Sequence, residues 1–71
     1  MMYLHPEPGM TYRHTKTGNL YTVEGVLPIK INGEWDLTGA VIYMSDESRE
    51  SLVRLTPDFQ ASFERVVDET A

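Results

Sequence analysis

The sequence predicts an all-β fold, a small SH3-like barrel of five to six strands with one short helical turn near the C-terminus. Short apolar or alternating runs recur between turns that contain glycine, proline or asparagine. Asn32-Gly33 is a strong signal for a tight two-residue hairpin turn. Gly25 inside a strand pattern predicts a bulge or sharp bend, which is the device that closes small barrels.

The first hairpin is expected over residues 11–27. Its strands are residues 11–15 and 20–27, and Gly18 and Asn19 between them tolerate the positive φ angles that a turn needs. One alternate set of the second strand is polar in its middle, so the other set is expected to face the core. The core-facing set is Tyr21, Val23, Gly25 and Leu27.

A second hairpin is expected around Asn32-Gly33, where residues 29–31 return through residues 34–37. Its apolar side chains are predicted to share one face and its charged side chains the other. We expect Trp35 to be a packing residue, or a lip of the barrel, rather than a platform for a ligand. The apolar set is Ile29, Ile31, Trp35 and Leu37, and the charged set is Lys30, Glu34 and Asp36.

Residues 39–44 are apolar at both alternate sets of positions, which predicts the most buried strand. Residues 45–51 predict a solvated polar loop, and residues 51–55 predict another strand. Thr56 and Pro57 are typical of a helix start, with a capping hydroxyl followed by proline. A single helical turn is expected to carry Phe59 inward before a last strand begins at Phe63.

The predicted domain organisation is an extended arm over residues 1–9, one domain over residues 10–67 and a frayed tail over residues 68–71. A domain this small has a thin core, and such domains often add disulfides, a metal or a second copy. The sequence has no cysteine, which removes disulfides and the usual zinc sites. We therefore expect a homodimer to supplement the core, and we expect no cofactor.

The charge is unevenly distributed. Residues 1–23 hold one acidic and two basic residues, whereas residues 24–71 hold ten acidic and four basic ones, for a net charge of −5. This balance argues against a nucleic-acid partner, because affinity for phosphate backbones comes mainly from clustered lysine and arginine. No apolar run approaches the length of a membrane span, and the first residues lack the pattern of a signal peptide. The expected location is cytoplasmic.

The sequence contains no pattern that predicts catalysis. It offers no cysteine nucleophile, no glycine-rich phosphate loop and no histidine with a well-placed polar partner, so we expect a protein that is not an enzyme. A metal site would require His5 and His14 to converge with an acidic residue. The densest group of donors and cations is Tyr12-Arg13-His14 with Lys16.

Two interpretations of this group stay open. In the functional one, Arg13 or His14 acts with Lys16 on a phosphate or carboxylate, which arginine clamps with two parallel hydrogen bonds. In the structural one, Tyr12 and His14 are half-buried and Arg13 pairs with an acidic residue on a neighbouring strand.

The pattern Tyr12-Arg13-His14-x-Lys16, continued by Gly18 and then Tyr21-x-Val23-x-Gly25-Val26, resembles the opening of a small bacterial and phage family known as domain of unknown function 1653. Val41-Ile42-Tyr43, Val53-Arg54, Phe59 and Phe63-Glu64-Arg65-Val66 resemble its later segments, so the resemblance spans residues 10–67. The family has no assigned activity. The resemblance implies a shared fold and draws attention to Tyr12, Arg13, His14, Lys16 and Arg54.

These observations lead to two hypotheses. The first is a non-catalytic binding module that holds an anionic small molecule or peptide group. Its ligand-binding residues would be Tyr12, Arg13, His14, Lys16, Tyr43 and Arg54. The alternative is an acidic interaction or inhibitor protein, of the kind that phages encode, which docks a basic host protein. Its acidic surface would consist of Glu34, Asp36, Asp46, Glu47 and Glu50.

Overall fold

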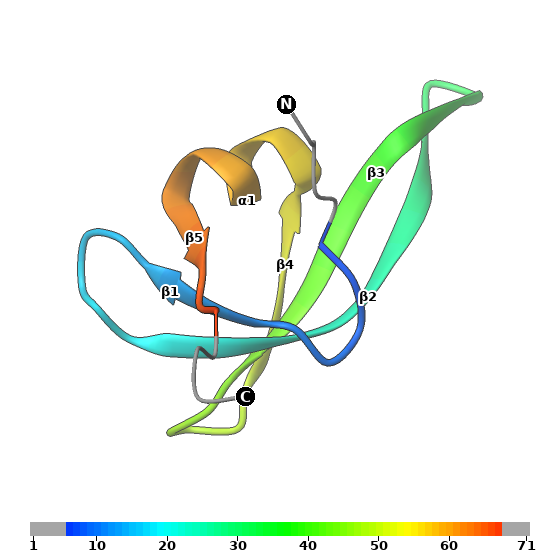
Figure 1. Cartoon of the computed structure of the whole chain (residues 1–71). Coiled ribbons are helices and arrows are strands. Elements are labelled where there is room, and N and C mark those ends of the chain that lie inside the picture. The colour runs from blue at the N-terminus through cyan, green and yellow to red at the C-terminus, as the bar shows by residue number, and fades with distance from the viewer. Residues whose placement is uncertain (1–5, 68–71) are drawn as a thin grey trace.

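Five β-strands and one short α-helix make up the part of the chain that the computed structural model describes, residues 6–67 (Figure 1). The strands are β1 (Thr11–His14), β2 (Leu20–Ile31), β3 (Glu34–Ser45), β4 (Ser51–Leu55) and β5 (Phe63–Arg65), and the helix is α1 (Thr56–Ser62). All strand pairs are antiparallel. The prediction of an all-β fold with one short helical segment near the C-terminus is confirmed.

The strands form one open sheet in the order β4-β3-β2-β1-β5. Within the described residues β4 and β5 are its two ends, so the sheet does not close into a barrel. Figure 1 shows that the sheet is strongly twisted and that α1 lies against one of its faces. We call the face covered by α1 the inner face and the opposite one the outer face. The likeness to SH3 barrels stays a prediction.

β2 is longer than predicted because it continues through Pro28. The register with β3 shifts between Leu27 and Ile29, so the missing N–H of the proline falls at an irregular point of the ladder. A second shift lies between Val23 and Gly25. This second irregularity confirms the bulge or bend predicted at Gly25. It also corrects the predicted core-facing set: Tyr21 and Val23 face the core, but beyond the shift Leu27 lies on the outer face and is 54% exposed.

The irregular pairing opposite Pro28 depends on Gly39 in β3. Its φ angle is 67°, in the left-handed region that favours glycine. A Cβ atom added to Gly39 would lie 2.1 Å from the carbonyl oxygen of Leu27, far inside contact distance. Glycine is therefore required here both for its φ angle and for the close approach of two backbones.

Residues 29–37, which we call the arm, extend away from the rest of the sheet (Figure 1). The tight turn predicted at its tip is confirmed, with both turn residues at positive φ. The register pairs Lys30 with Trp35 and Ile29 with Asp36, and directly paired residues share a face. The prediction of one apolar and one charged face is therefore wrong, because a two-residue turn places apolar residues of one strand opposite charged residues of the other.

Trp35 lies on this arm and packs at the surface. Its side chain is 63% exposed and does not belong to the core. The ammonium of Lys30 lies 5.5 Å from the centroid of the Trp35 ring, an exposed cation–π contact. Trp35 therefore packs against a neighbour on the arm and leaves most of its ring at the surface.

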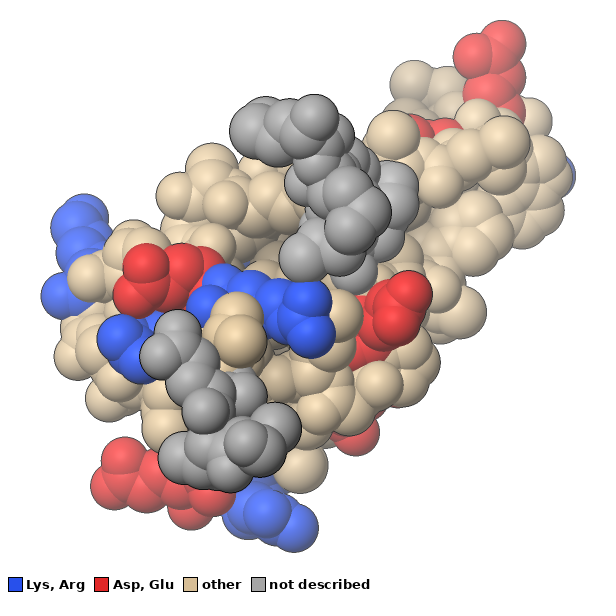
Figure 2. All heavy atoms as spheres, in the orientation of Figure 1, with Lys and Arg blue, Asp and Glu red and all other residues tan. Residues whose placement is uncertain are grey.

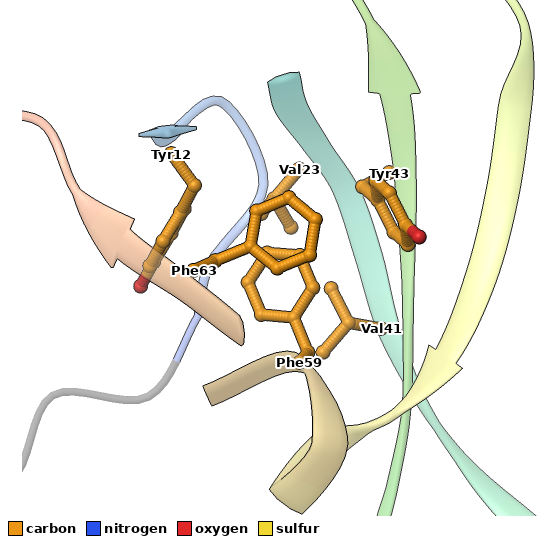
Figure 3. Packing of buried hydrophobic residues seen from close by; sticks show 6 residues of the cluster. All are labelled: Tyr12, Val23, Val41, Tyr43, Phe59 and Phe63. Carbon is orange, nitrogen blue, oxygen red and sulfur yellow. The ribbon is translucent and has the colours of Figure 1, made fainter. Parts of the chain in front are cut away.

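The core lies on the inner face and is mainly aromatic. The rings of Phe59 and Phe63 stack with centroids 4.3 Å apart and planes 9° apart, and they lie between Tyr12 and Tyr43 (Figure 3). Both tyrosine rings contact Phe59, at centroid distances of 5.0 Å and 5.2 Å. The cluster is completed by Val23 and Val41. The prediction that the helical turn carries Phe59 inward is confirmed.

The helix begins at Thr56 with proline in its first turn, as the sequence predicts. The predicted cap is not formed, because Leu55 is the N-cap and no side chain bonds to it. The Thr56 side chain is buried instead, and its hydroxyl has no hydrogen-bond partner among residues 6–67. Helix α1 is held mainly by its contacts with the sheet rather than by a capping bond.

The N-terminal segment of residues 1–9, which the sequence predicts to be extended, is attached to β2 at its end. The N–H of Gly9 donates to the carbonyl of Val23 at 2.9 Å, and the N–H of Val23 donates to the carbonyl of Met10 at 2.9 Å. The beginning of this N-terminal segment, residues 1–5, and the predicted tail, residues 68–71, lie outside the described residues.

Replacing Gly39 by alanine tests the close approach of the two backbones. We expect Gly39→Ala to lower the free energy of unfolding by at least about 2 kcal/mol, because the left-handed φ angle and the contact with Leu27 both oppose a Cβ atom. Gly18→Ala is the matched control, since Gly18 has a φ angle of 78° and open space around it. Gly18→Ala should lower the free energy of unfolding by about 1 kcal/mol. Equal losses in urea unfolding would contradict the contact.

Candidate functional site

Three of the six predicted ligand-binding residues meet around the ring of Phe63. The rings of His14 and Tyr43 pack edge-on against it, with centroids at 5.0 Å and 5.2 Å. The guanidinium carbon of Arg54 lies 5.3 Å from the same centroid. We call His14, Tyr43, Arg54 and Phe63 the Phe63 cluster. Its members come from β1, β3, β4 and β5, so only the folded sheet brings them together.

The other three predicted residues lie elsewhere. Tyr12 is buried in the core, on the side of Phe59. Arg13 is exposed, because alternation along β1 directs it to the outer face while its neighbours point inward. Lys16 lies in the exposed turn between β1 and β2. The six residues therefore do not line a common cleft.

Arg54 is bound tightly within the protein. Its Nε donates to the hydroxyl oxygen of Tyr43 at 2.9 Å, and its Nη1 donates to Asp58 at 3.2 Å and to the Ser62 hydroxyl at 3.3 Å. The hydrogen bond with Tyr43 is the main reason that the pKa of Arg54 lies above its ordinary value. Arg54 thus links β4 to β3 and α1, and its charge is already balanced by a carboxylate.

Arg13 is paired as the structural interpretation predicts. Its Nη1 lies 3.4 Å from Oε1 of Glu64 on the adjacent strand β5, and Arg13 and Glu64 are directly opposite in the register. Both side chains are about half exposed, and such surface pairs contribute at most about 1 kcal/mol. The interaction organises the outer face of β1 and β5 more than it stabilises the fold.

His14 is held by its own turn. Its Nδ1 lies 3.1 Å from the Thr17 hydroxyl, and its carbonyl accepts a hydrogen bond from the N–H of Gly18 at 2.8 Å.

Burial raises the pKa of the Tyr12 phenol above its ordinary value. Because the folded state holds this proton more strongly, Tyr12 contributes stability that is present below about pH 10 and is lost as the pH rises further.

Three hollows of the surface lie away from the predicted ligand-binding residues. One of about 440 Å³ lies on the arm, one of about 380 Å³ lies between residues 18–20 and 45–47, and one of about 490 Å³ lies between residues 8–11 and 65–67. None of these three is lined by a predicted ligand-binding residue. On the face shown in Figure 2, acidic side chains lie beside the basic ones, so this face carries no large patch of a single charge.

No group of three or more potential metal ligands occurs among residues 6–67. His14 lies beside Phe63 and Thr17, and His5 lies outside the described residues. The same described range contains no helix that is long and apolar enough to cross a membrane.

The outer face carries an apolar surface that the sequence analysis did not identify as a site. The register places Leu27, Ala40 and Leu55 in one row across the sheet and Ile42 beside Val53 in the next. Val53 is 63% exposed, Leu27 54% and Leu55 50%. We call these five residues the outer patch. The sequence feature that indicates this patch is the strand over residues 39–44. It is apolar on both faces, although α1 covers only the inner face of the sheet.

Acidic side chains lie along one border of the outer patch. Glu24 accepts a hydrogen bond from the Ser51 hydroxyl at 2.6 Å, and Asp46 accepts one from the Thr22 hydroxyl at 2.6 Å. Both carboxylates are therefore held against the sheet. The loop between β3 and β4 adds Glu47 and Glu50, with Arg49 as its one basic residue.

Comparisons with known proteins give no match: no family model, no curated protein and no solved structure is significantly similar to this chain. The resemblance to domain of unknown function 1653 therefore stays a prediction.

The hydrogen bond between Arg54 and Tyr43 can be tested by removing one oxygen atom. We expect Tyr43→Phe to lower the free energy of unfolding by about 1.5–3 kcal/mol, because the buried hydroxyl is bonded to a charged group. Tyr21→Phe is the control, since the half-buried Tyr21 belongs to the same aromatic network through its ring. Tyr21→Phe should lower the free energy of unfolding by less than about 0.5 kcal/mol. Equal effects in urea unfolding would show that the bond to Arg54 is unimportant.

Proposed function

We propose that this chain is a non-catalytic protein-binding module that docks a basic partner protein on the outer face of its sheet. The observation that carries the proposal is the outer patch, whose three most exposed members are at least half exposed on the face of the sheet opposite α1. Contiguous apolar surface with a polar border is typical of protein interaction sites. Covering it with a partner would remove this surface from water.

The charge of the border supports a basic partner. Glu24 and Asp46 are fixed beside the patch by their hydrogen bonds with Ser51 and Thr22. Opposite charge on the partner increases the association rate and selects against acidic competitors. A second copy fits less well as the occupant, because two chains of net charge −5 would bring like charges to the same contact.

The first hypothesis, an anionic ligand at the predicted site, has less support. Both arginines in question already have carboxylate partners, Glu64 for Arg13 and Asp58 for Arg54. The two predicted tyrosines, Tyr12 and Tyr43, are buried in the core. An anion would have to displace these existing partners before it could bind.

A selection from a random peptide display library tests the proposed function. Peptides retained by the wild-type protein at low salt should be enriched in lysine or arginine together with valine, isoleucine or leucine. They should be lost at high salt, because exposed charge pairs are screened. Binding to Val53→Glu should be at least about tenfold weaker, since a carboxylate would replace the most exposed apolar side chain of the patch.

Val67→Glu is the matched control, because Val67 has the same exposed fraction as Val53, 63%, and lies outside the patch. This variant should retain the selected peptides. Selection of acidic peptides, or equal retention by both variants, would contradict the proposal.

A further inference from the structure

The free edge of β4 shows how the partner would be held. We propose that the partner contributes an extended strand that pairs with β4 and continues the sheet. This inference rests on the proposed function and specifies the segment of the partner that the module recognises. Addition of a strand to an exposed sheet edge is a common form of peptide recognition, in which the main chain provides affinity and alternate side chains provide specificity.

β4 is the last strand on its side of the sheet that residues 6–67 form. Its sequence, SLVRL, contains neither proline nor lysine, and no register shift interrupts its pairing with β3. Exposed edges usually carry such features, which discourage pairing with other chains. The edge of β4 is therefore regular over its five residues, and no other strand of residues 6–67 covers it. Its one charged side chain, Arg54, lies on the inner face opposite Val41.

The phase of the hydrogen-bond ladder identifies which backbone groups face outward. The N–H of Ser45 donates to the carbonyl of Glu50 at 2.9 Å, so this pair is a hydrogen-bonded one. Hydrogen-bonded and non-hydrogen-bonded pairs alternate along an antiparallel ladder. Leu52 and Arg54 therefore bond to β3, and the N–H groups of residues 51, 53 and 55 point away from the sheet.

The same residues place their side chains on the outer face. Val53 pairs with Ile42 and Leu55 pairs with Ala40, so the outward-facing backbone of β4 belongs to members of the outer patch. A strand added here would set every second side chain beside Val53 and Leu55. Apolar residues at those alternate positions would extend the patch and cover its exposed edge.

The acidic loop gives the added strand a direction. The loop of residues 46–50 lies at the beginning of β4, so an antiparallel strand would end beside it. Basic residues at the C-terminal end of the partner segment would then lie near Asp46, Glu47 and Glu50. The recognised segment is accordingly an extended peptide with alternating apolar residues followed by lysine or arginine.

The probe is a synthetic peptide with the sequence Val-Thr-Val-Thr-Val-Lys-Lys-Lys, and the measurement is amide hydrogen exchange followed by NMR. On binding, exchange at Ser51, Val53 and Leu55 should slow by at least about tenfold, because these N–H groups gain acceptors. The amides of Leu52 and Arg54 serve as internal controls, since they are already bonded to β3.

The outcomes separate this inference from the proposed function. If the peptide binds and shifts outer-patch resonances while exchange at the three outward amides stays unchanged, strand addition is wrong and docking on the face stands. If neither this peptide nor any basic peptide from the library binds, the proposed function fails as well. A peptide that ends in three glutamates should bind at least about tenfold more weakly.

A substitution in the protein gives an independent readout. Val53→Pro removes an outward N–H without removing a ladder bond to β3, and proline is tolerated on edge strands in that orientation. We expect at least a tenfold loss of affinity, whereas Val53→Thr should retain most of the binding. Equal affinity of the two variants would overturn strand addition. Should Val53→Pro fail to fold, a peptide that is N-methylated at its central valine makes the same test on the wild-type protein.

Discussion

The stacking of Phe59 on Phe63 is the interaction on which the rest of this structure depends. Phe59 comes from α1 and Phe63 from β5, and their parallel rings form the centre of the inner face. Tyr12 from β1 contacts one ring, and Tyr43 from β3 contacts both. The stack thereby attaches the last two elements of the chain to the strands that precede them. It also gives Arg54 a ring face against which its guanidinium lies.

A core of this kind has a consequence for the opposite side of the sheet. One short helix and one aromatic cluster are enough to cover the inner face of a small open sheet, and residues 6–67 supply no second layer for the outer face. Of the apolar residues of β3 in the outer patch, Ala40 is buried, whereas Ile42 is only partly covered by its neighbours on β2 and β4. The outer patch and the free edge of β4 both follow from this single-layer arrangement. The proposals for binding depend on the same arrangement.

The sequence was sufficient for features that are encoded locally. Alternation and turn residues predicted the all-β fold, the bend at Gly25 and the tight turn at Asn32-Gly33. The requirement for Gly39 could not be predicted, because it arises from the carbonyl of a distant residue, Leu27. The Phe63 cluster was predicted only in part, since cross-strand neighbours are set by register and are invisible in a single sequence.

The contrast between the two faces of the sheet is the central claim, and paired alanine substitutions measure it most directly. Phe59→Ala should lower the free energy of unfolding by about 3–5 kcal/mol, because it removes the centre of the aromatic cluster. Val53→Ala, on the outer face, should lower it by less than about 0.5 kcal/mol in urea unfolding at dilute protein concentration. Losses of similar size for the two variants would mean that the outer face is packed, and would contradict the account.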